Sequence, residues 1–281
     1  MKTSRDLTAF SDFLSKERND SPHTVKAYLR DVEAFARFAD GYYGGRWSWE
    51  GVDRLAMRGF MAALQQRGLS RRSVGRAVSA LRTFYRFLSL ARGVSVNPAR
   101  AARTPRGERR LPSYLDRAEM DQLLHAAAEP PARGQGGARA LRDLAMIELF
   151  YSTGVRLSEL VGLNVEDVDL VSEQIKVRGK GKKERIVPVG SHAVKAVRNY
   201  YAARDQVLAD QPAPSAGGGR IGGSADRRAV FLNERGRRLS PRGVQMAIRR
   251  LLSSLARGPE LSVHSLRHAF ATHLLDAGAD L

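Results

Sequence analysis

The sequence contains no cysteine among its 281 residues. Disulfides are therefore excluded, and a zinc site is disfavoured because thiolates are among the commonest zinc ligands. It also lacks any run that approaches the ~18 apolar residues of a membrane span, and no apolar core of a signal peptide follows the N-terminal residues 1–6. We therefore expect a cytoplasmic protein that does not have a membrane as its partner.

Acidic residues are also in short supply. The chain has 29 Asp and Glu against 47 Lys and Arg, which gives a net charge of +18, and residues 1–110 carry 22 of the basic residues against 10 acidic ones. A cationic surface of this size attracts polyanions through counterion release, so nucleic acid is the favoured partner. A generally basic, well-solvated surface and an anionic membrane are the alternatives.

The length suits two domains, and an apolar content of 43% is ample for packed cores. The first hundred residues have helical patterns. Ser21-Pro22 is a suitable helix start, and a helix over 70–90 places apolar side chains on one face and basic ones on the other. We expect this basic face to lie in or beside a DNA groove, although a solvated face is the alternative. The arginines predicted to bind DNA are Arg71, Arg72, Arg76 and Arg86.

A proline- and arginine-rich stretch over 96–112 predicts a basic linker. Beyond it, the patterns predict helices over 116–128, 138–151 and 192–207 and a strand pair over 175–189. The Gly-rich stretch 211–226 is expected to be a flexible insertion. Its Gly217-x-Gly219-x-x-Gly222 spacing is that of a dinucleotide-binding loop, but neither a strand nor a helix flanks it, so we reject that interpretation.

Two arginines stand at predicted helix starts. Arg156 follows the Thr153-Gly154 break, and Arg267 lies three residues after His264 on a terminal helix, so the latter two side chains can point at one ligand. Helix starts favour anions, which suits a phosphate. Zinc fits poorly, because Ser265 stands where a metalloprotease helix needs glutamate. His273 falls on the apolar stripe of this helix and is predicted to belong to the core.

The stretch "IKVRGKGKKERIVPVG", residues 175–190, alternates apolar and basic residues and then returns as a second strand containing Ile186, Val187 and Val189. Gly179-Lys180-Gly181 falls at the turn of this predicted hairpin. Glycine on both sides allows a tight bend that turns Lys180 toward a partner. A solvated basic hairpin is the alternative for this motif taken alone.

Three ordered motifs, "TGVRLSEL", "VRGKGKKERIVPVG" and "HSLRHAFATHLLDAGADL", closely resemble those of the tyrosine recombinases, specifically the Xer-type. The front half, with "SPHTVKAYLRDVEAF" and "RRSVGRAVSALRTFYRFL", resembles the core-binding domain of that family. The resemblance implies a multidomain protein, with an all-α, SAM-like core-binding domain over 1–95 and a linker over 96–112. A mixed α/β, mainly helical catalytic domain with a small antiparallel sheet is expected over 113–281.

By this resemblance, Arg156 and Arg267 hold the scissile phosphate, Lys180 protonates the leaving 5′ oxygen, and His264 assists. No cofactor is implied, because a tyrosine stores the bond energy in a 3′-phosphotyrosine link. The family's tyrosine lies beyond the second arginine. All eight tyrosines of this chain precede that arginine, so the chain is expected to be truncated before its nucleophile and inactive as it stands.

The resemblance implies duplex DNA as substrate, a tetramer with itself or a paralogous recombinase, and a role in chromosome dimer resolution. A protein that only binds DNA is an alternative for the 281-residue chain. A type IB topoisomerase shares the chemistry, but the Xer-like N-terminal half disfavours it.

Overall fold

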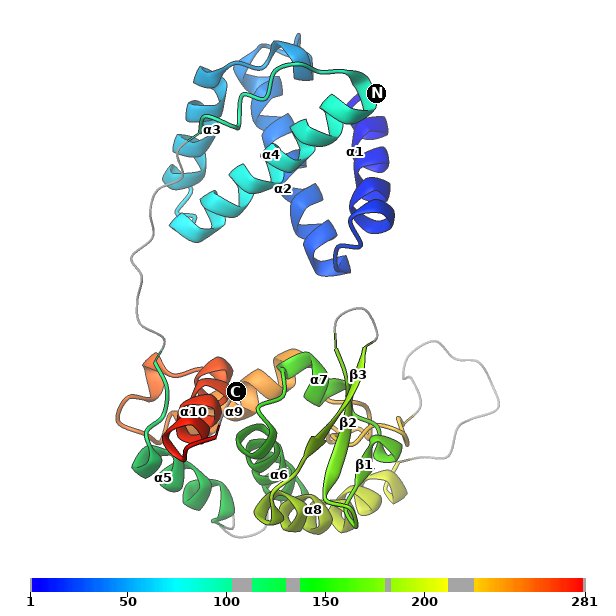
Figure 1. Ribbon diagram of the computed structural model, residues 1–281, viewed down its shortest axis with the longest axis vertical. Helices are drawn as coiled ribbons and strands as arrows, with labels where there is room; N and C mark the ends of the chain where they lie inside the picture. Colours follow the sequence, from blue (N-terminus) through cyan, green and yellow to red (C-terminus); the bar gives the residue numbers. More distant parts are fainter. Residues whose placement is uncertain (1, 103–112, 130–136, 180–182, 212–224, 280–281) are drawn as a thin grey trace. The chain divides into compact units, whose positions relative to one another are not determined.

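The computed structural model describes residues 2–102, 113–129, 137–179, 183–211 and 225–279. It divides into two compact units, Met1–Arg110 and Leu111–Leu281, which are described separately (Figure 1). The predicted boundaries at 95 and 112 stay a prediction. Ala99, at the start of the predicted linker, is buried in the first unit, where Arg82 donates hydrogen bonds to the carbonyls of Ala99 and Ala102.

The described part of the first unit is helical. Ser21 and Ser70 cap α2 (Pro22–Tyr42) and α4 (Arg71–Arg92), each accepting a hydrogen bond from the backbone N–H three residues on, at the helix starts that the sequence predicts. Gly93, with φ of +66°, ends α4 in the left-handed conformation that glycine adopts without strain. The helices are α1 (Lys2–Asp12), which continues into a π-helical turn (Phe13–Glu17), α2 (Pro22–Tyr42), α3 (Arg54–Gln66) and α4 (Arg71–Arg92).

Aromatic rings form the centre of this unit's core. Phe84 of α4 packs edge-to-face against Phe10 of α1 and Trp49, with ring centroids 5.0 and 4.6 Å apart, and Phe35 of α2 packs on Phe60 of α3 at 5.1 Å. Such edge-to-face pairs stabilise beyond the area they bury. The four helices are therefore joined through one aromatic cluster.

A buried ion pair crosses this unit and changes the interpretation of one predicted DNA contact. Arg76 of α4 donates two hydrogen bonds to Asp31 of α2, from Nε at 2.8 Å and from Nη2 at 3.0 Å, and Asp31 is buried. Asp31 therefore occupies two of the five N–H donors of Arg76 and neutralises its charge, which leaves Arg76 less suited to a phosphate than an unpaired arginine. Arg71, Arg72 and Arg86 lie exposed on α4.

The second unit combines helices with a three-stranded antiparallel sheet in the order β1-β2-β3 (Figure 1). Ile175 pairs with Val187 across β2 and β3, and Ile175 and Val177 are buried as their alternation predicts. Ile186 is exposed on β3. The α-helices and strands are α5 (Arg117–Ala128), α6 (Gly137–Thr153), α7 (Leu157–Gly162), β1 (Val168–Asp169), β2 (Gln174–Arg178), β3 (Glu184–Pro188), α8 (Ser191–Ala209), α9 (Pro241–Leu252) and α10 (Val263–Asp276).

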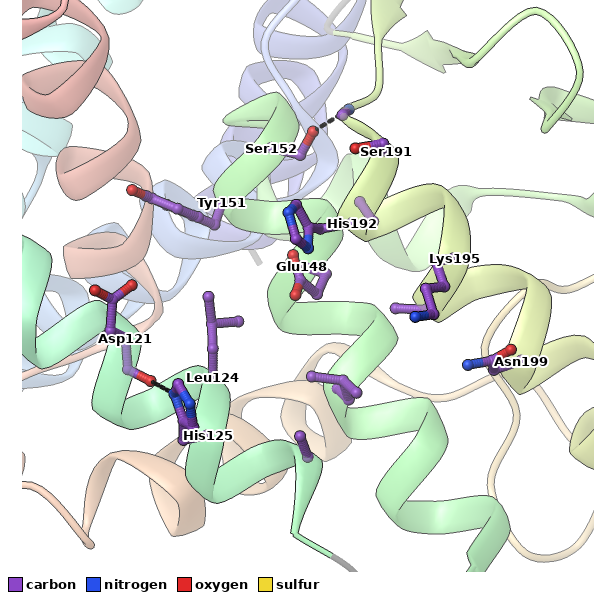
Figure 2. Close-up of a pocket in the computed structure, with 15 residues that line it drawn as sticks. Asp121, Leu124, His125, Glu148, Tyr151, Ser152, Ser191, His192, Lys195 and Asn199 are labelled. Carbon is purple, nitrogen blue, oxygen red and sulfur yellow. Dashed lines mark hydrogen bonds between the residues drawn. The ribbon is translucent and has the colours of Figure 1, made fainter.

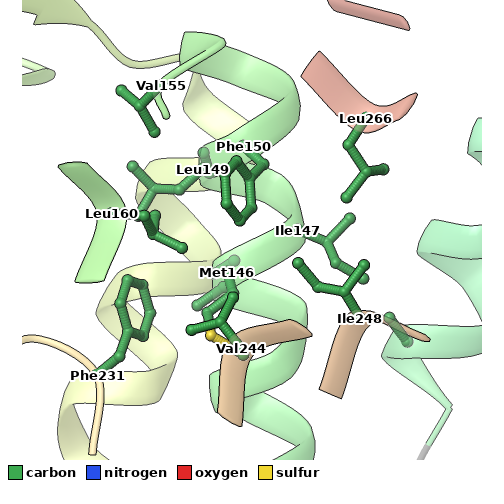
Figure 3. Close-up of a cluster of buried hydrophobic side chains, with 14 of the residues drawn as sticks. Met146, Ile147, Leu149, Phe150, Val155, Leu160, Phe231, Val244, Ile248 and Leu266 are labelled. Carbon is green, nitrogen blue, oxygen red and sulfur yellow. The ribbon is translucent and has the colours of Figure 1, made fainter. Parts of the chain in front are cut away.

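Helix α6 is the centre of this unit. It contacts α5, α8, α9 and α10, and its Ile147 and Phe150 pack among Leu160, Ile248 and Leu266 (Figure 3). The irregular segment 225–240 is attached to this core by hydrogen bonds from arginine side chains to carbonyl oxygens: Arg204 to Ala229 and Arg227, and Arg238 to Val161 and Leu163. Such bonds satisfy buried backbone groups that lie outside regular elements.

The predicted fold class is confirmed: a helical unit precedes a mainly helical unit with a small antiparallel sheet. Residues 212–224 of the Gly-rich stretch, which include the Gly217-x-Gly219-x-x-Gly222 spacing, lie outside the described residues. Within the ranges that the structure describes, no helix has both the length and the apolar content needed to cross a membrane.

The Asp31–Arg76 pair predicts a stability effect in the first unit. Arg76→Ala leaves a buried carboxylate without its partner and should lower the free energy of unfolding by roughly 2–3 kcal/mol. Both tryptophans, Trp47 and Trp49, lie in this unit, so urea unfolding followed by tryptophan fluorescence reports on it selectively. Arg72→Ala, an exposed control on the same helix, should leave the midpoint unchanged. Equal midpoints for the two variants would contradict a structural role for Arg76.

Candidate active site

The site begins at a glycine turn at the end of α6. Gly154 has a φ of +55°, and a Cβ placed on it would lie 2.2 Å from Cδ1 of Phe270 on α10. Both the backbone conformation and the lack of space require glycine here. The close approach brings α10 against the segment that connects α6 to α7.

The same approach positions Arg267. Its Nη1 donates a hydrogen bond to the carbonyl oxygen of Gly154, and the side chain is half-buried. Helix α10 begins after Ser262, whose N–H donates to the Ser265 hydroxyl at 3.0 Å. Leu266 and Ala269 are buried on the opposite side. The apolar face of α10 therefore fixes the direction in which Arg267 points.

Arg156 is the residue that precedes α7, and a buried carboxylate holds it. Its backbone N–H donates to Oε2 of Glu159 at 2.8 Å, and its Nη1 donates to Oε1 at 3.0 Å. The Glu159 side chain is 2% exposed, whereas that of Arg156 is 61% exposed. Arg156 is thus fixed at one end and open to a ligand at the other.

A second arginine, Arg185 of β3, binds the same carboxylate. Its Nη1 and Nη2 each donate to one Glu159 oxygen, both at 2.9 Å. Burial alone would raise the pKa of Glu159, but hydrogen bonds from Arg185 and Arg156 outweigh it and lower that pKa to about 2. Glu159 therefore stays ionised near neutral pH.

Electrostatics connect Arg267 to this cluster. Burial lowers the pKa of Arg267, and the charges of Arg156 and Arg185 lower it further, while Glu159 acts in the opposite direction. Two guanidinium groups thus bind the carboxylate directly, and the third, that of Arg267, is affected by the charges of all three groups. A group of cations that repel one another in a partly buried place is stabilised by an incoming anion.

Two further predicted site residues are His264 and Lys180. His264 lies exposed in the first turn of α10, one turn before Arg267, as predicted. Lys180 falls outside the described residues, so its predicted role stays a prediction. The base of its hairpin is described: the Gly179 N–H donates to the Lys183 carbonyl at 2.8 Å, and a Cβ on Gly179 would lie 3.7 Å from Oε1 of Glu159. The hairpin turn therefore starts beside the Arg156 cluster.

His273 belongs to the core, as the sequence predicts. It is buried, and its Nδ1 lies 3.0 Å from the Tyr151 hydroxyl, with the Tyr114 ring edge-on at 6.4 Å. This histidine therefore contacts α6 through Tyr151.

The sequence interpretation missed Glu159 and Arg185. A signal for Glu159 was present, because a glutamate three residues into a helix often accepts the N–H of the capping residue. Arg185 had no comparable signal, since 26 residues separate it from Glu159.

A pocket elsewhere in the unit does not involve these residues. It has a volume of about 710 Å³ and lies among α5, α6 and the start of α8, with Glu148, Tyr151 and His192 in its lining (Figure 2). Burial raises the pKa of Glu148, which His192 partly offsets. None of Arg156, Glu159, Arg185 or Arg267 lines it. In the part of the chain that the structure describes, no cluster of three His, Cys, Asp or Glu residues could hold a metal.

Comparison with known families agrees with both units. Residues 113–281 match the phage integrase family, and residues 7–92 match the phage integrase N-terminal SAM-like domain. The chain belongs to the phage integrase family, that of the tyrosine recombinases.

Its curated relatives include Xer-type proteins. The chain is 39% identical over 275 residues to the tyrosine recombinase XerC of Pelobacter propionicus, covering 98% of this chain and 83% of the relative. It is 40% identical to that of Azotobacter vinelandii, covering 98% and 84%.

Solved structures share the fold. A XerH site-specific recombinase bound to its palindromic difH substrate matches with a TM-score of 0.68 at 18% identity, over 98% of this chain and 75% of that one. The Tn1549 transposon integrase in complex with transposon right-end DNA matches with a TM-score of 0.68 at 18% identity, over 98% and 88%.

The Gly154 turn predicts a strict side-chain requirement. Gly154→Ala forces a Cβ into Phe270 and strains the backbone, so the second unit should lose about 2–4 kcal/mol of stability through overpacking and backbone strain. Calorimetry should show a lowered transition that tryptophan fluorescence, which reports the first unit, does not follow.

Phe270→Ala in the Gly154→Ala background removes the clash and should recover part of that loss. Gly162→Ala, where a Cβ would meet nothing within 4 Å, is the control. A Gly154→Ala protein as stable as this control would show that α10 does not need the close approach.

Proposed function

We propose that this protein is a site-specific DNA recombinase that cleaves and rejoins duplex DNA through a 3′-phosphotyrosine intermediate. The observation that carries the proposal is a cluster of three arginines: Arg156 and Arg185 bind the carboxylate of Glu159, and Arg267 is hydrogen-bonded to the Gly154 carbonyl, two residues before Arg156. Counted as unit charges, this group has an excess of about two positive charges at close range. A phosphodiester carries one negative charge and gains more during displacement, so the charges match the reacting group better than the resting one.

Each residue has a distinct part in this proposal. The exposed ends of Arg156 and Arg267 bind the non-bridging phosphate oxygens, with planar guanidinium groups suited to two hydrogen bonds each. Lys180 protonates the departing 5′ oxygen as a general acid, and His264 supplies a hydrogen bond or a proton. A tyrosine hydroxyl attacks the phosphorus and releases its proton to solvent, while the bond to the 5′ oxygen breaks and that oxygen takes the proton of Lys180. Rejoining reverses these steps, so the reaction requires neither a cofactor nor net hydrolysis.

The exposed arginines of α4 support DNA binding by the first unit. Arg71, Arg72 and Arg86 are proposed to contact DNA phosphates, whereas Arg76 serves mainly to neutralise Asp31. By analogy with its XerC relatives, the protein is proposed to act in chromosome dimer resolution, in a tetramer with itself or a paralogous recombinase on paired sites.

The tyrosines favour a second candidate for residues 1–281, namely a protein that binds DNA without cutting it. In the second unit, Tyr200 is buried and accepts a hydrogen bond from the Leu232 N–H at 3.0 Å. The Tyr201 hydroxyl is also buried, and burial raises the pKa of this tyrosine to about 12. Tyr151 is engaged with His273. These three hydroxyls are therefore poorly placed to attack a phosphate.

The proposed phosphate clamp predicts that cleavage is lost while binding persists. In the protein expressed from its whole reading frame, Arg267→Ala should slow single-turnover cleavage by about 100-fold or more, as expected for loss of one donor to a developing oxyanion. DNA affinity should fall less than tenfold, because many other phosphates are contacted. The control is Arg228→Ala, which removes the same charge from an exposed pair with Glu166. Equal losses of affinity and rate in the Arg267 variant would contradict the assignment.

The tyrosine positions predict that residues 1–281 alone form no covalent link to DNA. A nicked suicide substrate is incubated with this polypeptide and separated on a denaturing gel, while a mobility shift confirms that the complex has formed. We expect the shift without a covalent band, because the hydroxyls of Tyr151, Tyr200 and Tyr201 are buried or hydrogen-bonded and are not oriented for in-line attack. A covalent band that disappears on Tyr200→Phe or Tyr201→Phe would overturn both the site and the binding-only candidate.

A further inference from the structure

Glu159 is shared evenly by two arginines. Each of its oxygens accepts one hydrogen bond from Arg156 and one from Arg185: Oε1 from the Nη1 atoms of both residues, and Oε2 from the Arg156 backbone N–H and the Arg185 Nη2. The four distances fall between 2.8 and 3.0 Å. A carboxylate held at both oxygens from two directions has little freedom to rotate.

The two arginines use this carboxylate differently. Arg185 directs both terminal nitrogens at Glu159. Arg156 donates to Glu159 through one terminal nitrogen only, and within the described residues its other terminal nitrogen makes no hydrogen bond, on a side chain that is 61% exposed. Arg185 therefore serves to hold the carboxylate, whereas Arg156 is held by the carboxylate in a position where its exposed end can bind a ligand.

From this difference we infer that Arg185 is a positioning residue for Arg156, acting through Glu159. Bidentate bonds from Arg185 fix the plane of the carboxylate, and that plane sets where the Arg156 guanidinium lies. The inference rests on the proposed function to the extent that Arg156 binds the scissile phosphate.

The position of Arg185 in the sheet makes this fixation effective. Arg185 pairs with Val177 in the β2–β3 ladder, and Val177 is buried in the core of the unit. The strand therefore holds the Arg185 backbone in register. The Gly179 N–H closes the same ladder on the Lys183 carbonyl beside Glu159. Arg185 thus joins the base of the hairpin to the start of α7.

A purely stabilising role is the competing explanation, and the chain supplies a matched control for it. Arg178 lies on the same hairpin with a side chain 42% exposed, equal to that of Arg185. It also binds a buried carboxylate through two terminal nitrogens, that of Asp167, both at 2.9 Å. No contact joins Arg178 or Asp167 to Arg156 among the described residues. Loss of either arginine removes a two-nitrogen contact from a buried acid, but only one of the two acids holds Arg156. Arg178 also bonds to Glu184, so its loss removes at least as many contacts as the loss of Arg185.

The first experiment measures cleavage in the whole-reading-frame protein at saturating DNA. Arg185→Gln should slow the cleavage step about 10- to 100-fold, as expected for a misplaced phosphate-binding group, with a Kd within about threefold of wild type. Arg178→Gln should keep both the cleavage rate and the Kd within about threefold of wild type. Arg185→Lys should recover only part of the rate, because a lysine replaces two parallel bonds by one.

A double-mutant cycle then separates action through Arg156 from direct phosphate contact. In an Arg156→Ala background, Arg185→Gln should add less than about threefold, because its effect passes through the residue already removed. Multiplicative losses in the double variant would mean that Arg185 acts on the phosphate by itself, and would overturn the inference.

The second experiment does not depend on cleavage. Residues 1–281 labelled with ¹⁵N-arginine give side-chain Nε–Hε signals, and the Arg156 signal is assigned by its loss in Arg156→Lys. Arg185→Gln should shift this signal and increase its mobility, while Arg178→Gln should leave it unchanged. If the shift and the mobility of the Arg156 signal are unchanged in Arg185→Gln, the positioning role is contradicted, even if this variant has lost cleavage. If Arg185→Gln changes the Arg156 signal as expected but the wild-type protein does not cleave DNA, the proposed function alone is contradicted.

Discussion

The second unit depends on one buried carboxylate. Removing a charge from water costs several kcal/mol unless partners compensate, and Glu159 is compensated by two guanidinium groups and one backbone N–H. These partners come from the start of α7 and from β3, so the ionised acid joins a helix terminus to a sheet. The low pKa of Glu159 means that this connection does not respond to pH near neutrality. A neutral residue at position 159 would leave the arginines to repel each other with nothing between them.

Close backbone packing at Gly154 positions the other arginine of the site, Arg267. Gly154 permits the contact with Phe270, and the carbonyl of the same glycine accepts the hydrogen bond from Arg267. A single residue without a side chain therefore decides both the distance of α10 and the direction of its arginine. Arg156 and Arg267 lie 111 positions apart in the chain but are positioned from the two sides of this short turn. The site is thus an outcome of helix packing around α6, and its precision follows from a dense core rather than from a loop.

The sequence could predict those features that depend on local periodicity. The helix starts at Ser21 and Ser70, the alternation in β2 and the core position of His273 all follow from spacing and capping, and the structure has them. The pairing of Asp31 with Arg76 could not be predicted, because the apolar stripe of α4 does not indicate what opposes its polar face. The same holds for Arg185, which lies on a strand whose Ile186 is exposed although apolar. In both cases a contact distant in sequence gives a charged side chain a structural partner where surface exposure was expected.

Collecting positive charge at a site has a cost for the free protein. Burial and the neighbouring arginines both lower the pKa of Arg267, so the folded chain holds this guanidinium in a less favourable environment than water would provide. A bound anion reduces this penalty, and an anion with additional negative charge reduces it further. An arrangement of this kind favours the charge of a displacement at phosphorus over that of a resting phosphodiester, because the donors are already oriented and need no reorganisation. The contacts that stabilise the fold around Glu159 and the repulsion that destabilises Arg267 therefore belong to one electrostatic arrangement, in which folding fixes the orientation of the arginines and leaves an excess of positive charge that an anion would neutralise.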